Sequence, residues 1–256
     1  MTYILVRHYT SVSVADIAYL LSGVGHPDEE LDRREQIANN LVPDGDTVRL
    51  VKPPDGPLSV ESTAEEQWAA VALLRSIKAH ETEFDAFFIG CFGEPGLGAV
   101  REATDKPVVG SATAIFHTAA QIADQFSVLT ILDATKPMVH RQIQRNHLGE
   151  RLASVRVVEA PVLDIDHSSS ELVKDLITTG RATVAEDDAG AVIPGCMSLS
   201  FMQVHDRIGD ELSVPFLDPV RIGLGTAALW ARWGVSQSAA AYPSPDASKL
   251  QSLYSD

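Results

Sequence analysis

The two cysteines of the chain, Cys91 and Cys196, are the residues best suited to chemistry, and each ends an apolar run. The runs read Asp85-Ala-Phe-Phe-Ile-Gly-Cys91 and Asp188-Ala-Gly-Ala-Val-Ile-Pro-Gly-Cys196, and both have the composition of buried strands. Ligands bind at the carboxyl ends of strands in α/β sheets. Two thiols at two such ends could therefore face one substrate and move a proton between the two faces of one carbon.

The residues that follow each cysteine favour a reactive thiol. A free thiol has a pKa near about 8.5, and the N–H groups at a helix N-terminus lower it. Pro95 suits the start of a helix after Cys91, and Ser198 suits the N-cap of a helix after Cys196. We therefore expect a lowered pKa for both thiols, and the same N–H groups could hold a carboxylate or an enolate oxygen. The repeated placement favours this interpretation over two small buried hydrophobes.

The elements that must position these thiols follow a strand–helix alternation. Short runs rich in Val, Ile, Leu and Phe alternate with Ala-rich stretches at helical spacing, which is typical of a mainly parallel sheet. The expected strands cover 3–7, 47–51, 86–90, 107–109, 127–132, 154–158, 191–193 and 214–217. The expected helices cover 14–23, 28–40, 63–79, 113–125, 137–148, 169–187 and 219–233.

The first four expected strands match the second four in order, and the two cysteine runs match each other. The fold class this predicts is α/β with two similar lobes. Each lobe would hold a mainly parallel four-stranded sheet flanked by helices, with a pseudo-two-fold relation and a cleft between the lobes. We expect residues 1–112 plus 219–256 to form the first lobe, with the C-terminal helix and tail packing back, and residues 113–218 to form the second.

Charge and segment composition limit the partners. Asp and Glu total 35 against 20 Lys and Arg, which gives a net charge of −15 and argues against nucleic acid or an anionic membrane as a partner. The sequence has no signal-peptide pattern and no apolar run near the ~18 residues that span a membrane, so a cytoplasmic location is expected. No cysteine or histidine spacing indicates a metal site.

Several segments resemble a known family. Ile89-Gly-Cys-Phe-Gly-Glu-Pro-Gly-Leu-Gly-Ala-Val-Arg-Glu, Lys106-Pro-Val-Val-Gly, Gly56-Pro-Leu-Ser-Val-Glu61 and Arg151-Leu-Ala-Ser-Val-Arg resemble the Asp/Glu/hydantoin racemase family, closest to its hydantoin and allantoin racemase branch. The resemblance implies a racemase or epimerase that needs no cofactor. It implies Cys91 and Cys196 as the acid/base pair at a carbon next to a carbonyl, and a homo-oligomer. The substrate would be a small hydantoin-, allantoin- or amino-acid-like molecule, anionic or amide-bearing.

The substrate-facing motifs depart from the family. Where relatives carry Ile-Asn-Pro-Asn-Thr/Ser, this chain reads Val6-Arg-His-Tyr-Thr-Ser11, which places Arg7 and Tyr9 at the two asparagines, followed by Thr10. An Arg at a strand end could pair with a carboxylate through two hydrogen bonds. The other expected substrate contacts are Phe92, Gly93, Thr113, Met197 and Ser198, and the bulk of Met197 should narrow the pocket.

Two alternatives stay open at this point. One is a cis–trans isomerase of an unsaturated diacid, in which one cysteine adds covalently to the substrate. The other is a non-catalytic small-ligand-binding protein, because two lobes around a cleft also suit a receptor.

Overall fold

Two parallel β-sheets organise the computed structural model, which describes residues 11–253. The first sheet has the order β2-β1-β3-β4, with β1 Asp16–Leu20, β2 Thr47–Val51, β3 Ala86–Ile89 and β4 Val108–Gly110. The second has the order β6-β5-β7, with β5 Phe126–Thr130, β6 Leu152–Val157 and β7 Val192–Pro194. All paired strands are parallel, which confirms the predicted α/β class.

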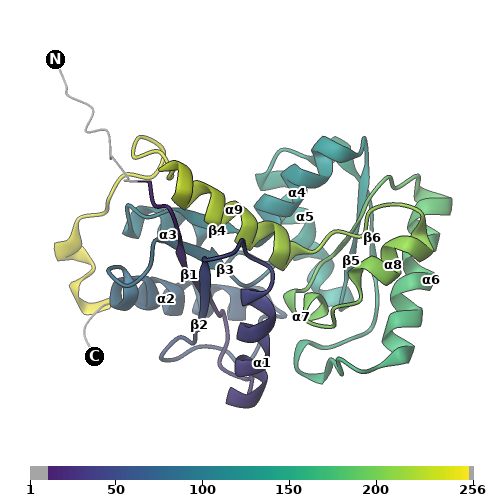
Figure 1. The fold of residues 1–256 in the computed structure, drawn as a ribbon, viewed down its shortest axis with the longest axis horizontal. Helices are drawn as coiled ribbons and strands as arrows, with labels where there is room; N and C mark the ends of the chain where they lie inside the picture. The colour runs from purple at the N-terminus through teal and green to yellow at the C-terminus, as the bar shows by residue number, and fades with distance from the viewer. Residues whose placement is uncertain (1–10, 254–256) are drawn as a thin grey trace.

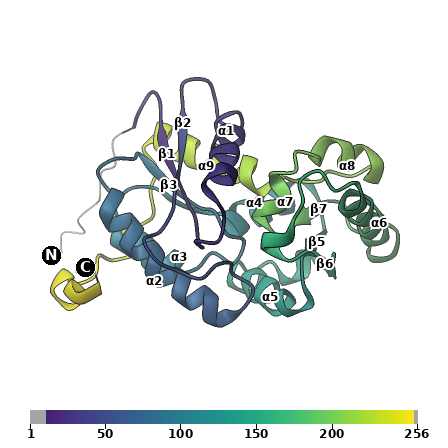
Figure 2. The same ribbon diagram turned by 90° about the horizontal axis from the view of Figure 1, so that it is seen from below.

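Helices flank both sheets and form two groups in the views of Figures 1 and 2. The helices of the first group are α1 Asp28–Asn39, α2 Thr63–His80 and α3 Leu97–Ala103, and those of the second are α5 Lys136–Arg145, α6 Ser170–Asp187, α7 Met197–Ser200 and α8 His205–Leu212. Between the groups run α4 Ser111–Ile122 and α9 Pro219–Trp233, which pack against each other. The chain thus crosses from the first sheet to the second through α4 and returns to the first through α9, and these two helices lie side by side.

Strand β3 is the centre of the first core. Its four residues are all buried, and Phe87 packs into a cluster with Leu73 while Phe88 packs toward α9. Helix α9 approaches closely because it presents Gly223 to Phe88: a Cβ at that position would lie 2.1 Å from Phe88 Cε2. A run buried on both faces explains why the sequence shows no polar alternation here.

The expected helix over 14–23 is wrong, because this segment contains β1. The run from Ile17 to Leu20 is fully buried on both faces, so it has neither the two-residue alternation of a half-exposed strand nor a polar helix face. Without either pattern, the alanines of the segment 14–23 favour the prediction of a helix. The expected strand over 3–7 lies outside the described residues. The first described strand is β1, which lies between β2 and β3 in the sheet.

The second sheet has three strands rather than the expected four. The segment 214–217 makes a single bridge, Val192 with Phe216, fixed by hydrogen bonds from Val192 N to Pro215 O and from Leu217 N to Val192 O, 2.9 Å each. Pro215 has no N–H to extend the pairing, and Asp218 already caps α9. With this bridge counted as the position of a fourth strand, both sheets have the same order. The lobe boundaries at residues 112, 113, 218 and 219 stay a prediction.

The segment after Gly234 packs against the first sheet through Gln237. Gln237 is buried and its Nε2 donates to Thr104 O at 2.8 Å and to Lys106 O at 2.7 Å, while Val108 N donates to its Oε1 at 3.1 Å. The C-terminal segment is thereby attached to the edge of the first sheet. None of the helices in the described range 11–253 has the length and apolar character needed to cross a membrane.

Candidate active site

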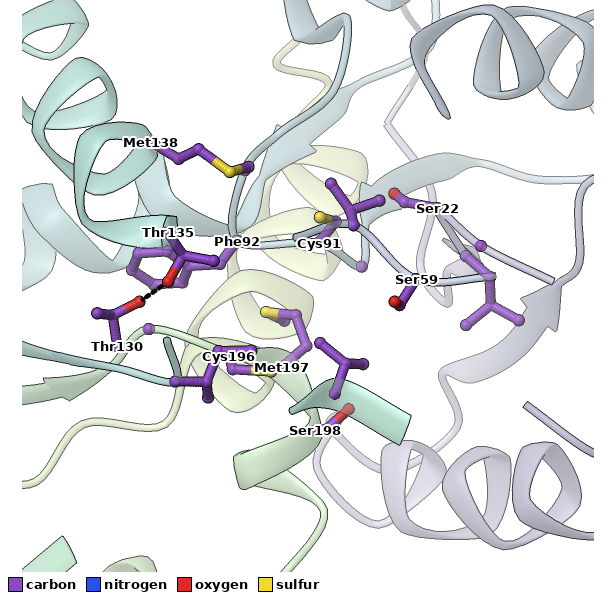
Figure 3. Close-up of a pocket in the computed structure, with 18 of the residues that line it drawn as sticks. Ser22, Ser59, Cys91, Phe92, Thr130, Thr135, Met138, Cys196, Met197 and Ser198 are labelled. Atoms are coloured by element: carbon purple, nitrogen blue, oxygen red, sulfur yellow. Dashed lines mark hydrogen bonds between the residues drawn. The ribbon is translucent and has the colours of Figure 1, made fainter. Parts of the chain in front are cut away.

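Cys91 and Cys196 line one pocket between the two sheets (Figure 3). Cys91 lies two residues after the end of β3, and Cys196 lies two residues after the end of β7, so the thiols enter from corresponding strands of the two sheets. The pocket encloses about 780 Å³ of space, including solvent at its mouth. Both cysteines are free thiols.

A glycine precedes each cysteine for a packing reason. A Cβ on Gly90 would lie 1.9 Å from Tyr19 Cε1, and a Cβ on Gly195 would lie 2.9 Å from Val128 Cγ1. In both cases a side chain of the central strand occupies the space beside the glycine. The Gly-Cys pair therefore lets the chain turn out of the sheet against that strand and present the thiol to the pocket.

The pocket wall combines apolar surface with a few hydroxyl and amide groups. Four of the predicted contacts line it, namely Phe92, Gly93, Met197 and Ser198. The apolar part of the wall also includes Leu21, Leu58, Val60, Ile131, Met138, Val139 and Val162, and the polar part includes Ser22, His26, Arg34, Ser59, Thr130, Thr135 and Gln142.

Burial dominates the protonation of Cys91. It raises the pKa of the thiol to about 12, although part of the residue is reached by solvent. The N–H of Gly93 and the hydroxyl of Ser22 lower the pKa, and a negative charge on Cys196 raises it. Both thiols lie on the wall of one pocket, so a charge on one affects the protonation of the other.

Burial also raises the pKa of Cys196, and it outweighs three groups that lower the pKa. These are Ser198, through its N–H and its hydroxyl, the guanidinium of Arg34, and the N–H of Leu199. The expected net lowering of both pKa values is therefore wrong. The N–H groups are present as expected and lower the pKa of each thiol. Burial destabilises the thiolate by more than these groups stabilise it, so the net pKa is raised.

Ser198 has a different position from the predicted N-cap. It lies inside α7, and Cys196 itself is the N-cap residue of that helix. Met197 is almost fully buried and lies on the pocket wall. That its side chain narrows the pocket stays a prediction.

Thr113 does not line this pocket. Its backbone N and its Oγ1 donate to the buried carboxylate of Glu94, at 2.6 and 2.9 Å. Glu94 follows Cys91 by three residues, so Thr113 supports the loop after the first cysteine from behind. Arg7, Tyr9 and Thr10 lie outside the described residues, and the segment that follows β1 into the pocket is Leu21-Ser22-Gly23.

Several polar pocket residues were missed by the sequence reasoning. Ser22 follows β1, which we expected to be a helix, and this error hid it. Gln142 of α5 donates from Nε2 to Gly93 O and so holds the loop after Cys91. His26 has a pKa lowered to about 4, by burial first and then by Arg34, so its imidazole is neutral at neutral pH. His26 therefore adds a neutral hydrogen-bonding group to the pocket wall.

Arg34 is the buried cation of the pocket wall. It lies on α1, only 3% exposed, and its Nη2 donates to Ser198 Oγ at 3.0 Å. Across the described part of the chain, no group of three or more His, Cys, Asp or Glu side chains is arranged to hold a metal ion.

Comparison with known proteins identifies the class of the protein, which is an isomerase of the racemase type. The model of the family described as "Asp/Glu/Hydantoin racemase" matches residues 31–227, well over half of the chain. The chain therefore belongs to the Asp/Glu/hydantoin racemase family, in the hydantoin and allantoin racemase branch. This removes the alternative of a non-catalytic binding protein.

Individual relatives agree with this branch. The chain is 34% identical over 191 residues to the hydantoin racemase of Pseudomonas sp. (strain NS671), covering 74% of this chain and 76% of that protein. It is 31% identical over 205 residues to the hydantoin racemase of Paenarthrobacter aurescens, covering 79% and 86%. The solved structure of allantoin racemase from Klebsiella pneumoniae matches with a TM-score of 0.83 at 27% identity, covering 93% of this chain and 98% of that one.

Proposed function

We propose that the protein is a racemase or epimerase that needs no cofactor, in which Cys91 and Cys196 are the acid and the base at one carbon next to a carbonyl. The observation that carries this proposal is that both thiols enter one pocket from corresponding strands of the two sheets. A carbon held between them would offer its hydrogen to one sulfur and its opposite face to the other.

The chemical step is a proton transfer that balances without a further reactant. One cysteine, as thiolate, takes the proton of the stereogenic carbon: an S–H bond forms, the C–H bond breaks, and the electron pair moves onto the carbonyl oxygen. The other thiol then gives its proton to the opposite face of the carbon. The negative charge passes from one sulfur to the other, and the configuration is inverted.

The raised pKa values suit a weak carbon acid. A thiolate whose conjugate acid is weak is a strong base, and the mainly apolar wall of the pocket limits its solvation. The N–H groups of Gly93 and Ser198, which lower the pKa of Cys91 and Cys196 respectively, hydrogen-bond each sulfur while it carries the charge. Because both pKa values are raised, only a small fraction of the enzyme carries one thiolate and one thiol at neutral pH.

The proposed substrate class is a five-membered cyclic amide of the hydantoin or allantoin type, with amino-acid-like molecules as the second choice. Such a ring has N–H donors and C=O acceptors on neighbouring edges, and the hydroxyl groups of Ser22 and Ser59 on the wall can donate or accept. The mainly apolar remainder of the wall would surround the substituent on the reacting carbon. The names of the relatives support the same class.

The finer expectations on location and assembly are also part of the proposal: a cytoplasmic homo-oligomer that binds small molecules and no nucleic acid. The net charge of −15 supports the absence of a polyanionic partner. Three large apolar side chains on the packed helices α4 and α9 are exposed, Ile122, Leu229 and Trp233, and they suit a contact between copies. Light scattering and gel filtration measure the mass directly.

Chiral analysis in deuterated water tests the mechanism. Single enantiomers of hydantoins, allantoin and amino acids are incubated with the wild type, with Cys91→Ala and with Cys196→Ala. The wild type should racemise one of these substrate classes and introduce one solvent deuterium at the carbon whose configuration is inverted. Each alanine variant should racemise that substrate at least about 100-fold more slowly. Full activity in either variant would remove that thiol from the mechanism.

Two further samples sharpen this experiment. Cys91→Ser and Cys196→Ser keep a side chain of similar size but have no accessible anion, so they should be as inactive as the alanine variants. An unsaturated cis-diacid is included in the panel to test the cis–trans isomerase alternative. Its conversion, with a thioether adduct visible by mass spectrometry, would favour that reaction instead.

A further inference from the structure

The two thiols have different electrostatic surroundings. Arg34 lies on the Cys196 side of the pocket and is fixed on three sides. Its Nε donates to Glu30 Oε1 at 2.6 Å, its Nη2 donates to Ser198 Oγ at 3.0 Å, and its guanidinium lies 4.7 Å from the centre of the Phe201 ring. A cation with only 4% of its side chain exposed is weakly screened by solvent.

The charge around Arg34 is not cancelled by its carboxylate partner. Glu30 is shared, because Arg33 Nε donates to its other oxygen at 2.8 Å. Two guanidinium groups on one carboxylate leave a net charge of +1 in this cluster. Burial acts to raise the pKa of Glu30, but the hydrogen bonds from Arg33 and Arg34 lower it to about 2, so the carboxylate stays ionised at neutral pH.

Ser198 connects this cation to the sulfur of Cys196. Its oxygen accepts the hydrogen bond from Arg34, which leaves its single hydrogen free to donate to the thiolate. Arg34 acts on Cys196 through this hydroxyl and also directly through its charge.

Cys91 has no comparable support from charge. The charges that act on it most strongly are those of Cys196 and Glu66, and both raise its pKa. Glu66 is buried, and its ion pairs with Arg141 and Arg145 are long, at 3.9 and 3.8 Å. The groups that favour the Cys91 anion are neutral donors, Gly93 N–H and the Ser22 hydroxyl.

We propose that Arg34, acting through Ser198 and through its own charge, makes Cys196 the first of the two thiols to lose its proton. Before a substrate reacts, Cys196 is then the thiolate base and Cys91 the protonated acid. Arg34 is a positioning residue of the reaction. The inference rests on the proposed two-cysteine mechanism and adds a direction to it. Racemisation of the opposite enantiomer requires the proton to be exchanged within the pair first.

The other ionisable groups near the pair do not reverse this order. Tyr19 of β1 stays a neutral phenol because burial raises its pKa. The imidazoles that face Arg34 and Glu30 have pKa values lowered by burial and are neutral at neutral pH, namely His26 and His167. Asp218, at the start of α9, acts on Tyr19 and is hydrogen-bonded to the first N–H groups of its helix.

Titration of single-thiol proteins tests the order. Cys91→Ala leaves Cys196 as the sole thiol, and Cys196→Ala leaves Cys91. Ultraviolet absorbance of the thiolate is followed against pH, and the double alanine variant supplies the baseline for tyrosine ionisation. This readout needs neither substrate nor a reagent that must reach a buried sulfur.

Three substitutions, each combined with the two single-thiol proteins, identify the cause. We expect Cys196 to titrate at lower pH than Cys91. Adding Arg34→Gln should raise the midpoint of Cys196 by about one pKa unit or more, which is about a tenfold loss of thiolate below the midpoint. The same change should move Cys91 much less. Arg34→Lys keeps the charge and should retain most of the effect, and Ser198→Ala should raise the midpoint of Cys196 alone.

The outcomes separate this inference from the function on which it rests. A lower midpoint for Cys91, or equal shifts of both thiols with Arg34→Gln, would overturn the role of Arg34 whatever the enzyme racemises. If Arg34→Gln does not fold, Ser198→Ala tests the route through the hydroxyl, and an unchanged Cys196 midpoint there, together with a Cys91 midpoint at or below that of Cys196 in the single-thiol proteins, overturns it. Loss of the two-cysteine mechanism would be seen instead in the chiral assay, with the titration order intact.

Discussion

The ring of Tyr19 lies against Gly90 so closely that a Cβ at position 90 would come within 1.9 Å of Tyr19 Cε1. Tyr19 is fully buried in β1, and its edge meets the ring of Phe88 with centroids 5.2 Å apart. The central strand thereby supports the turn that presents Cys91. A tyrosine in the core determines where the first thiol lies.

Gly90→Ala should be destabilising, because the new methyl group can be placed only if Tyr19 moves out of its packed position. Overpacking of this kind costs about 1–3 kcal/mol. We also expect lower racemase activity, because the thiol of Cys91 moves with the turn. Urea unfolding and the chiral assay measure the two effects.

Gly98→Ala is the matched control for this change. A Cβ there meets nothing within 4 Å, and the residue lies in α3. Alanine in a helix is favoured over glycine by about 0.5–1 kcal/mol. The packing explanation fails if the two variants are equally stable.

Thr113→Val tests whether this residue binds substrate, as the sequence predicted, or supports the loop after Cys91. The valine side chain cannot donate to Glu94 Oε2, while the backbone N–H of residue 113 still donates to Oε1. Glu94 is buried, and this burial raises its pKa. Leaving a buried acceptor without its donor costs about 1–3 kcal/mol, so we expect lower stability with KM unchanged. Thr118→Val in the same helix loses only a bond to Ala114 O and should change neither. A higher KM at full stability would restore Thr113 as a substrate contact.

Glu30 makes the protein sensitive to acid. Its pKa is about 2 in the folded protein, against 4.5 for the group without these partners, so its contribution to stability is complete above about pH 4.5 and is lost as the pH falls toward 2. Glu30→Gln should therefore lower stability at neutral pH and flatten its dependence on pH in this window. The check is a set of urea unfolding curves between neutral pH and about pH 3. Glu29→Gln, at the exposed neighbouring position, should keep the slope of the wild type.

The sequence allowed the thiol pair to be predicted because the information is local. Each cysteine ends an apolar run and follows a glycine, and the two runs match each other. The parallel sheets follow from the same strand–helix alternation. These features depend on neighbours in the chain, and the fold reproduces them.

The first strand and the buried cation could not be predicted in the same way. A strand buried on both faces has no periodicity that separates it from a short helix, so β1 was missed together with Ser22 behind it. Arg34 is separated from Ser198 by 164 positions and stands in a segment rich in charged residues. Only the packing of α1 beside the second cysteine distinguishes it from its exposed neighbours.

The supports of the two thiols are exchanged between the sheets. Arg34, on a helix beside the first sheet, acts on the cysteine of the second, while Gln142, on a helix of the second sheet, holds the loop of the first cysteine. A single sheet with its own helices would thus carry a thiol without its partner groups. A substitution near either sheet must therefore remain compatible with the cysteine of the other sheet.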